Sequence, residues 1–280
     1  MATRFLPATK GIPKLLLPLV DKPTIQYAVE EAEGSGIEQI FMVIGGVNAF
    51  IAEHFTPNLQ LESVLRSRGK DDLLERIRQV DELAQKVDLC FIEQAEPLGL
   101  GHAVWTARRL VAGEVCACLL PDDVIIGRPK PCLKQLIEAH MEKGGTVVAA
   151  MRVPDEQVSR YGIIATGKRN GRLHEVNDVV EKPDLTQAPS RLAILGRYVL
   201  EPDVFEALDE LKPGTGGEIQ LTDAIRATIP EGKVWALEFE GDYYDTGEIP
   251  GYLRANVSLA LQTPGLRDRI EPLLRSLLDD

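Results

Sequence analysis

The sequence lacks the features of a secreted, membrane-spanning or zinc-bound protein. Its four cysteines (Cys90, Cys116, Cys118 and Cys132) form no CxxC pair, and none precedes a histidine at zinc-finger spacing. No stretch approaches the roughly 18 uninterrupted apolar residues that a membrane span needs, and the amino-terminal MATRFLPATKG has no apolar signal-peptide core. We therefore expect free, reduced thiols and a cytoplasmic location.

Positive charge is also scarce. The 280 residues carry 31 lysines and arginines against 43 aspartates and glutamates, a formal net charge of -12. Because nucleic acids and anionic membranes attract proteins through a net basic face, this balance argues against both as partners. A phosphate-bearing ligand would have to meet a local basic cluster or arrive with a metal ion.

Short apolar runs alternate with helical periodicity over the first 152 residues. Strands are predicted at 39–44, 87–92, 115–120 and 146–151, and helices at 24–34, 103–110 and 132–141. This order favours an α/β fold with a mostly parallel sheet sandwiched by helices. Ligands of such sheets bind beyond the carboxyl ends of the strands. Those ends are Gly45-Gly46, residues 94–101 and Asp122-Asp123.

Three short segments have residue types that suit a phosphorylated ligand. A Pro/Gly-containing loop, residues 7–14 with Arg4 ahead of it, could neutralise a polyphosphate, and Asp122-Asp123 could hold Mg²⁺. Glu181-Lys182 could bind sugar hydroxyls and a phosphate. For each segment taken alone, a solvated loop or turn is the commoner explanation. The chain has no P-loop, no HExxH motif and no Ser/His/Asp arrangement.

Taken together, the segments resemble the bacterial UTP–glucose-1-phosphate uridylyltransferases of the sugar-phosphate nucleotidylyltransferase family. The resemblance covers almost the whole chain and keeps the family's order. It rests on TRFLPATKGIPK (3–14), LPLVDKP (17–23), QAEPLGLGHAV (94–104), LPDDVI (120–125), YGII (161–164), VEKP (180–183), GRYVL (196–200), GEIQLTDAI (217–225) and YDTG (244–247).

The resemblance implies one Rossmann-like nucleotidyltransferase domain over residues 1–280. Its parts would be nucleotide-binding (1–152), sugar-phosphate-binding (153–262) and a carboxyl-terminal helix (263–280). UTP and glucose 1-phosphate would give UDP-glucose and pyrophosphate, and the chain would form a homo-oligomer.

The resemblance also implies a role for each matching residue. Arg4 and Lys14 would contact the nucleotide phosphates, and Lys182 would grip the sugar phosphate. Gln94 and Gly99 would read the base. Gly162, Glu181 and Tyr198 would bind the sugar, and Asp122 and Asp245 would bind Mg²⁺.

The chain departs from the family pattern at three places. The family begins with an apolar strand and a Gly-rich loop, so we expect a sheet that lacks this first strand. Leu15 replaces a glutamate near the nucleobase, and residues 248–251 lack a lysine common after YDxG. Two alternatives therefore stay open: a catalytically impaired regulatory relative, and the same reaction with another nucleoside triphosphate.

Overall fold

The computed structural model describes residues 3–45, 49–214, 217–230 and 233–279, so Met1 and Gly46 lie outside it. Its largest sheet has six strands in the order β5-β10-β7-β11-β9-β8. In chain order they are β5 (Cys116–Leu119), β7 (Thr146–Arg152), β8 (Gly162–Asn170), β9 (Leu173–Glu181), β10 (Leu192–Leu200) and β11 (Val234–Glu238).

The α/β class is confirmed, but the six-stranded sheet is mixed rather than mostly parallel. Only β7 and β11 pair in parallel, whereas β10 runs antiparallel to both β5 and β7. The reason lies in the second half of the chain. There β8 and β9 form a hairpin that turns at Gly171, whose φ of 60° is a conformation that favours glycine.

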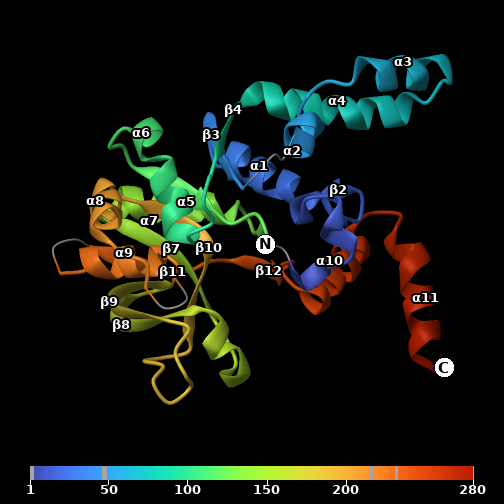
Figure 1. The fold of residues 1–280 in the computed structure, drawn as a ribbon. Coiled ribbons are helices and arrows are strands. Elements are labelled where there is room, and N and C mark those ends of the chain that lie inside the picture. Colours follow the sequence, from blue (N-terminus) through green and yellow to red (C-terminus); the bar gives the residue numbers. More distant parts are fainter. Residues whose placement is uncertain (1–2, 46–48, 215–216, 231–232, 280) are drawn as a thin grey trace.

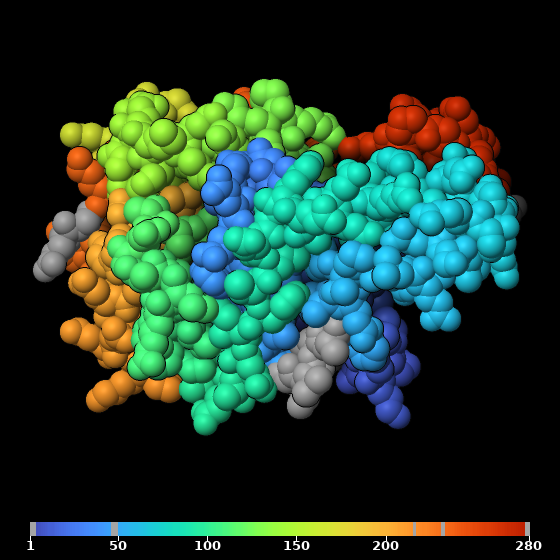
Figure 2. All heavy atoms as spheres, turned by 90° about the horizontal axis from the view of Figure 1, so that it is seen from above, coloured from blue at the N-terminus to red at the C-terminus, as the bar shows by residue number. Residues whose placement is uncertain are grey.

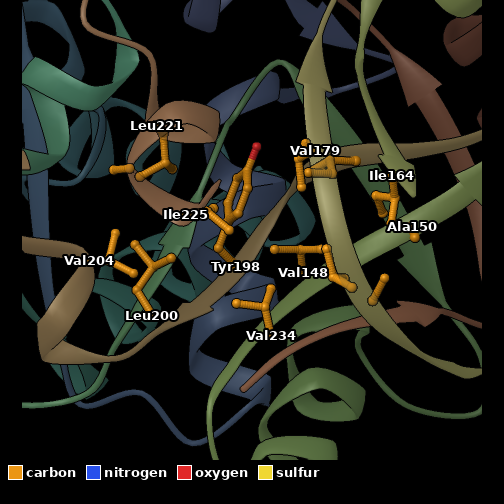
Figure 3. Packing of buried hydrophobic residues seen from close by; sticks show 14 of the residues in the cluster. Val148, Ala150, Ile164, Val179, Tyr198, Leu200, Val204, Leu221, Ile225 and Val234 are labelled. Carbon is orange, nitrogen blue, oxygen red and sulfur yellow. The ribbon is translucent and has the colours of Figure 1, made fainter. Parts of the chain in front are cut away.

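Helices cover both faces of this sheet, because successive strand residues alternate between the faces. On one face Val148, Tyr198 and Leu200 pack against α8 (Pro202–Glu210) and α9 (Leu221–Thr228), as Figure 3 shows. On the other face Val147 and Val199 pack against α7 (Cys132–Lys143). The predicted two-sided coverage is therefore present.

Two smaller strand pairs stand beside this sheet. β3 (Gln39–Ile44) pairs in parallel with β4 (Asp88–Glu93), and β6 (Asp123–Gly127) pairs antiparallel with β12 (Gly241–Asp245). A third pair joins β1 (Pro18–Leu19) and β2 (Lys22–Pro23).

The remaining helices surround these pairs. Figure 1 shows α3 and α4 projecting from one side and α11 lying apart from the sheet. In Figure 2, α3 and α4 form one end of the molecule, and the segment of α8 and α9 forms the other. The helices not yet given are α1 (Thr24–Gly34), α2 (Ala49–His54), α3 (Leu59–Ser67), α4 (Asp71–Lys86), α5 (Leu100–Thr106), α6 (Arg108–Val111), α10 (Ile249–Gln262) and α11 (Arg267–Asp279), with short 3-10 turns η1 (Thr3–Phe5), η2 (Ala8–Lys10), η3 (Lys14–Leu16) and η4 (Asp155–Arg160).

A cavity of about 550 Å³ separates the β3–β4 pair from the main sheet. Its walls include both β3 and β5. In the described part of the chain, β3 pairs only with β4, and β5 only with β10.

All four cysteines are free, as expected. Among the described helices, none is both long and apolar enough to cross a membrane.

Candidate active site

Asp122 and Asp245, far apart in sequence, converge where β6 and β12 pair. The register places Asp245 opposite Asp123, and Thr246 donates to the Asp122 carbonyl oxygen from both its N–H (2.8 Å) and its hydroxyl (2.7 Å). A Cβ on Gly247 would lie 2.8 Å from Asp245 Oδ1 and 3.3 Å from Asp122 Oδ2. The two carboxylates therefore border one small space that a side chain at position 247 would fill.

Each of these carboxylates already has a cationic partner. Lys14 Nζ lies 2.8 Å from Asp122 Oδ2, and Arg160 Nη2 lies 2.6 Å from Asp245 Oδ2. Arg160 also reaches Glu248 Oε1 at 2.9 Å. Lys14 is placed by η3, which lies far from Asp122 in sequence. Each of the two carboxylates is therefore paired with a positive charge.

Asp123 supports this arrangement from inside the protein. Its Oδ2 accepts the Gly196 N–H at 2.8 Å, and its Oδ1 accepts the Tyr243 hydroxyl at 2.9 Å. Burial, followed by the charge of Asp122, raises the pKa of Asp123 to about 6. Both oxygens are used within the fold, so Asp122 rather than Asp123 is the carboxylate available to a ligand.

A second group of polar atoms lies around Glu181, at the end of β9. Gly162 is its partner in the β8–β9 ladder, and a Cβ at Gly162 would lie 3.2 Å from Glu181 Oε2. The Thr222 hydroxyl donates to the same oxygen at 2.8 Å. Lys182 Nζ lies 3.2 Å from Glu181 Oε1, and its side chain is 54% exposed. Glycine at 162 leaves this carboxylate approachable.

Lys182 has a backbone conformation that is unusual for its residue type. Its φ is 44°, in the left-handed region, and its N–H donates to the Tyr161 carbonyl oxygen at 3.0 Å. Such conformations cost free energy and persist where the surrounding structure fixes them, often at functional sites.

The carboxylate pair and the Glu181 group are joined by three successive residues. Arg160 binds Asp245, the Tyr161 carbonyl accepts the Lys182 N–H, and Gly162 pairs with Glu181. The two groups therefore belong to one site.

The loop between β4 and α5 meets the same region. Gln94 Nε2 donates to the Gly99 carbonyl at 3.2 Å and lies 3.0 Å from His102 Nδ1. Gly99 has φ 99°, and a Cβ there would lie 2.8 Å from the Ile219 carbonyl oxygen. Ile219 in turn donates to the Leu98 carbonyl at 2.7 Å. This loop is thus tied to the segment that leads into α9.

Tyr198 and Arg4 occupy different surroundings. Tyr198 is a core residue, 6% exposed, and Figure 3 shows its hydroxyl on the side away from Leu200 and Val234. Burial raises the pKa of Tyr198 well above its usual value. Arg4 is exposed, and none of the contacts found among the described residues joins it to Asp122 or Asp245. Lys14 therefore reaches the site, whereas Arg4 does not contact it.

The structure also places Leu15 and shows three polar residues at the site that the sequence analysis did not predict. Leu15 packs on the cluster of Ile25 and Val29, so its position is apolar. The residues that sequence reasoning did not single out are Arg160, Thr222 and Thr246. Thr222 lies inside GEIQLTDAI, Thr246 lies inside YDTG, and Arg160 directly precedes YGII. These segments were the only features of the sequence that could have pointed to the three residues.

Comparison with known proteins gives a consistent result. The model of a family described as nucleotidyl transferase matches residues 1–262. The UTP–glucose-1-phosphate uridylyltransferase 2 of Staphylococcus saprophyticus is 46% identical over 277 residues, covering 99% of this chain and 94% of the relative. The UTP–glucose-1-phosphate uridylyltransferase of Bacillus subtilis is 45% identical over 279 residues, covering 100% and 94%.

Two solved structures are similar over most of their length. A UDP-glucose pyrophosphorylase complexed with UDP-glucose superposes with a TM-score of 0.83 at 38% identity, covering 94% of this chain and 96% of that one. A UTP-bound UGPase from Acinetobacter baumannii superposes with a TM-score of 0.89 at 36% identity, covering 99% and 95%.

Proposed function

The chain belongs to the nucleotidyl transferase family, and on that premise we propose how its residues transfer a uridylyl group. The reaction is UTP plus glucose 1-phosphate giving UDP-glucose and pyrophosphate. Relatives named for this reaction share nearly the full length of the chain. The observation that carries the residue roles is the convergence of Asp122 and Asp245 beside the Glu181–Lys182 group.

On the nucleotide side, Lys14 and Arg4 neutralise the phosphates of UTP. Lys14 lies beside Asp122, and Arg4 precedes it on the same amino-terminal segment. Gln94 and the backbone of Gly99 read the uracil, because the loop that carries them offers an amide and backbone groups. Gly99 is required there by its φ and by the nearby Ile219 carbonyl.

The carboxylates Asp122 and Asp245 fit a divalent cation, for which we propose Mg²⁺. Hard oxygen ligands are the kind Mg²⁺ prefers, and it usually takes only one or two carboxylates and completes its shell with phosphate and water. Among the described residues, no group of three or more His, Cys, Asp or Glu is placed to hold a metal, so the proposal relies on these two carboxylates alone. Bound Mg²⁺ supplies positive charge to the phosphate oxygens.

On the sugar side, Glu181 and the backbone of Gly162 hold glucose hydroxyls, with Tyr198 lining that side, and Lys182 holds the phosphate. The attacking phosphate oxygen is already anionic, so no general base is needed. The barrier comes from bringing two anions into line, and positioning with charge neutralisation lowers it. Two like charges 4 Å apart repel by about 4 kcal/mol at an effective dielectric of 20. Lys182 offsets this repulsion on the attacking side.

The test is pyrophosphate release with each nucleoside triphosphate in turn, glucose 1-phosphate and a series of divalent cations. We expect release with UTP and Mg²⁺. Asp122→Asn and Asp245→Asn should lose activity and weaken Mn²⁺ binding measured by calorimetry. Asp242→Asn is the matched control, because Asp242 lies on β12 but pairs with Arg128 at 2.7 Å. Equal losses in all three variants would refute the metal assignment.

The same assay separates the two alternatives. A regulatory relative, suggested by Leu15, would bind UTP in calorimetry without releasing pyrophosphate. Preference for another base would appear as release with that triphosphate instead of UTP.

Location and assembly are proposed on separate grounds. Four free cysteines fit a reduced, cytoplasmic compartment. Exposed Leu253 and Val257 on α10, with Leu273 and Leu277 on α11, fit association between copies of the chain. Light scattering would report the oligomeric state. The division into residues 1–152, 153–262 and 263–280 likewise remains a proposal.

A further inference from the structure

The loop proposed to read the base leads into a histidine that has no role in the proposed reaction. His102 lies in the first turn of α5, and its Nδ1 atom is 3.0 Å from Gln94 Nε2. The same Gln94 nitrogen donates to the Gly99 carbonyl oxygen at 3.2 Å. The side-chain amide of Gln94 therefore has two partners, both on the short segment that enters α5.

These two contacts determine which way the amide points. A backbone carbonyl oxygen only accepts hydrogen bonds, so the Gln94 atom that faces the Gly99 carbonyl is the NH2 nitrogen and not the oxygen. The second hydrogen of this nitrogen is then the one available to His102 Nδ1. Because Nδ1 can accept it only without a proton of its own, the ring proton of neutral His102 lies on Nε2. The opposite tautomer would require the amide oxygen at this place, where it would face the carbonyl oxygen of Gly99.

With both amide hydrogens used, Gln94 has only an acceptor left for a ligand. Within the described part of the chain, no donor bonds to Gln94 Oε1. An acceptor at this place suits a base that presents a ring N–H. Uracil has one at N3, whereas the N3 atom of cytosine is itself an acceptor and would repel the oxygen. A site whose polar group is left unpaired by the wrong ligand discriminates strongly against that ligand.

The imidazole of His102 is held in turn by a stack of side chains. Its ring lies 5.6 Å from the Trp105 ring, with an angle of 27° between the two planes. The Arg108 guanidinium lies 3.5 Å from the centre of the Trp105 ring. Trp105 Nε1 also donates to Asp209 Oδ1 of α8 at 2.5 Å. Because this stack restricts rotation of the imidazole, Nδ1 stays turned toward Gln94.

We propose that His102 is a positioning residue for base selection: its unprotonated Nδ1 holds the Gln94 amide with the oxygen toward the base, which favours uracil over cytosine. His102 does not touch the ligand and acts through Gln94. The proposal rests on the role of Gln94 in the reaction proposed above, whereas the hydrogen-bond pattern can be measured without any substrate.

The first test reads the position of the ring proton directly. The full chain is produced with isotopically labelled histidine, and NMR correlations between ring protons and ring nitrogens report the tautomer of each of the four histidines. We expect a proton on Nε2 alone for His102. For His140 we expect a protonated Nδ1, because that atom faces the Gly145 carbonyl oxygen at 2.8 Å. The signals missing from His102→Asn assign the residue. A proton on Nδ1 of His102 in neutral form would overturn the proposal.

The second test compares UTP with CTP in pyrophosphate release. His102→Asn keeps an acceptor, because Asn Oδ1 stands as many bonds from Cα as His Nδ1, whereas His102→Leu keeps none. In His102→Leu, the ratio of kcat/KM for UTP to that for CTP should fall at least about tenfold. In His102→Asn the ratio should stay within about threefold of the native value. His140→Leu is the matched control and should keep the native ratio, since it removes another half-buried histidine with one hydrogen bond from Nδ1.

A merely structural role for His102 would give a different result. Damage to the fold would lower kcat/KM for both nucleotides together and leave their ratio unchanged. That outcome in His102→Leu, with the native chain active on UTP, would overturn the proposal and leave the reaction standing. The KM for glucose 1-phosphate should be the same in all variants, because His102 acts only on base recognition. A folded native chain that releases no pyrophosphate with UTP would refute the proposed reaction and base selection with it, whatever the tautomer.

Discussion

Replacing Arg197 by methionine should destabilise the protein more than replacing Arg197 and Glu31 together. Arg197 is 1% exposed, and it donates to Glu31 Oε2 from Nε at 2.9 Å and from Nη2 at 2.7 Å. Its Nη1 donates to the carbonyl oxygens of Leu120 and Gly196. Glu31 Oε1 accepts the Leu133 N–H at 2.9 Å, in the first turn of α7. One buried ion pair therefore joins α1, β10, α7 and the turn before Asp122.

The magnitude follows from what each variant leaves behind. Arg197→Met leaves the Glu31 carboxylate buried without its partner, which typically costs about 3–5 kcal/mol. In the double variant no charge is left. The Leu120 and Gly196 carbonyls keep other donors, the N–H groups of Asp123 and Leu120 respectively. Only the Leu133 N–H then loses its acceptor, which costs about 1–3 kcal/mol. We therefore expect a coupling of about 3 kcal/mol or more between the two positions.

The assay is urea unfolding of the native chain, both single methionine variants and the double variant. Reversibility and agreement between fluorescence and circular dichroism must be checked first, because the free energies require two-state behaviour. If the double variant is destabilised by the sum of the single losses, or Arg197→Met costs less than about 1 kcal/mol, the pair does not act as described.

Three further predictions concern the site and the pH dependence. Lys182→Ala should raise the KM for glucose 1-phosphate about ten- to hundredfold by removing a charged hydrogen bond, whereas exposed Lys168→Ala should not; equal kinetics would refute the role. Gly99→Ala should raise the KM for UTP more than Gly113→Ala alters it. Both have positive φ, but only at Gly99 would the Cβ meet a carbonyl oxygen at 2.8 Å. Burial lowers the pKa of His54 in the folded chain, so the stability contributed by its neutral form is fully present above about pH 6.5 and is lost as the pH falls. The urea midpoints of the native and His54→Gln chains should therefore converge on acidification.

Much of the fold could be predicted because several elements have strong local patterns. The apolar run at 39–44 matches β3 residue for residue. The helical spacing after Pro131 matches the start of α7. The pattern at 103–110 predicted one helix, but the structure has α5 and α6 separated at Ala107. The spacing of apolar residues is nearly the same on both sides of this one-residue break. The sequence pattern therefore could not show that the helix is interrupted.

The candidate site depends on a pairing that local pattern cannot contain. β6 and β12 are short strands with carboxylates at their ends, and neither was predicted. Their register, with Asp123 opposite Asp245, joins segments more than a hundred residues apart. The residue types at Asp122 and Asp245 indicated metal binding, but their proximity came only from this ladder. The sequence did not indicate Arg160 for the same reason. Its partners, Asp245 and Glu248, lie at the end of β12 and just after it, far along the chain.

The charges of the site explain how an acidic protein can accept two phosphorylated substrates. Three carboxylates proposed to act in the reaction each have a cationic partner in the absence of ligand: Asp122 has Lys14, Asp245 has Arg160 and Glu181 has Lys182. These three pairs offset part of the negative charge of the site, to which Asp123 and Glu248 add two further carboxylates. A metal ion bound to Asp122 and Asp245 would displace their cationic partners, Lys14 and Arg160, which could then pair with the phosphates. The metal and the nucleotide would thus each replace one member of an existing ion pair. Binding of the two should then be mutually favourable, since each provides the charge that the other displaces.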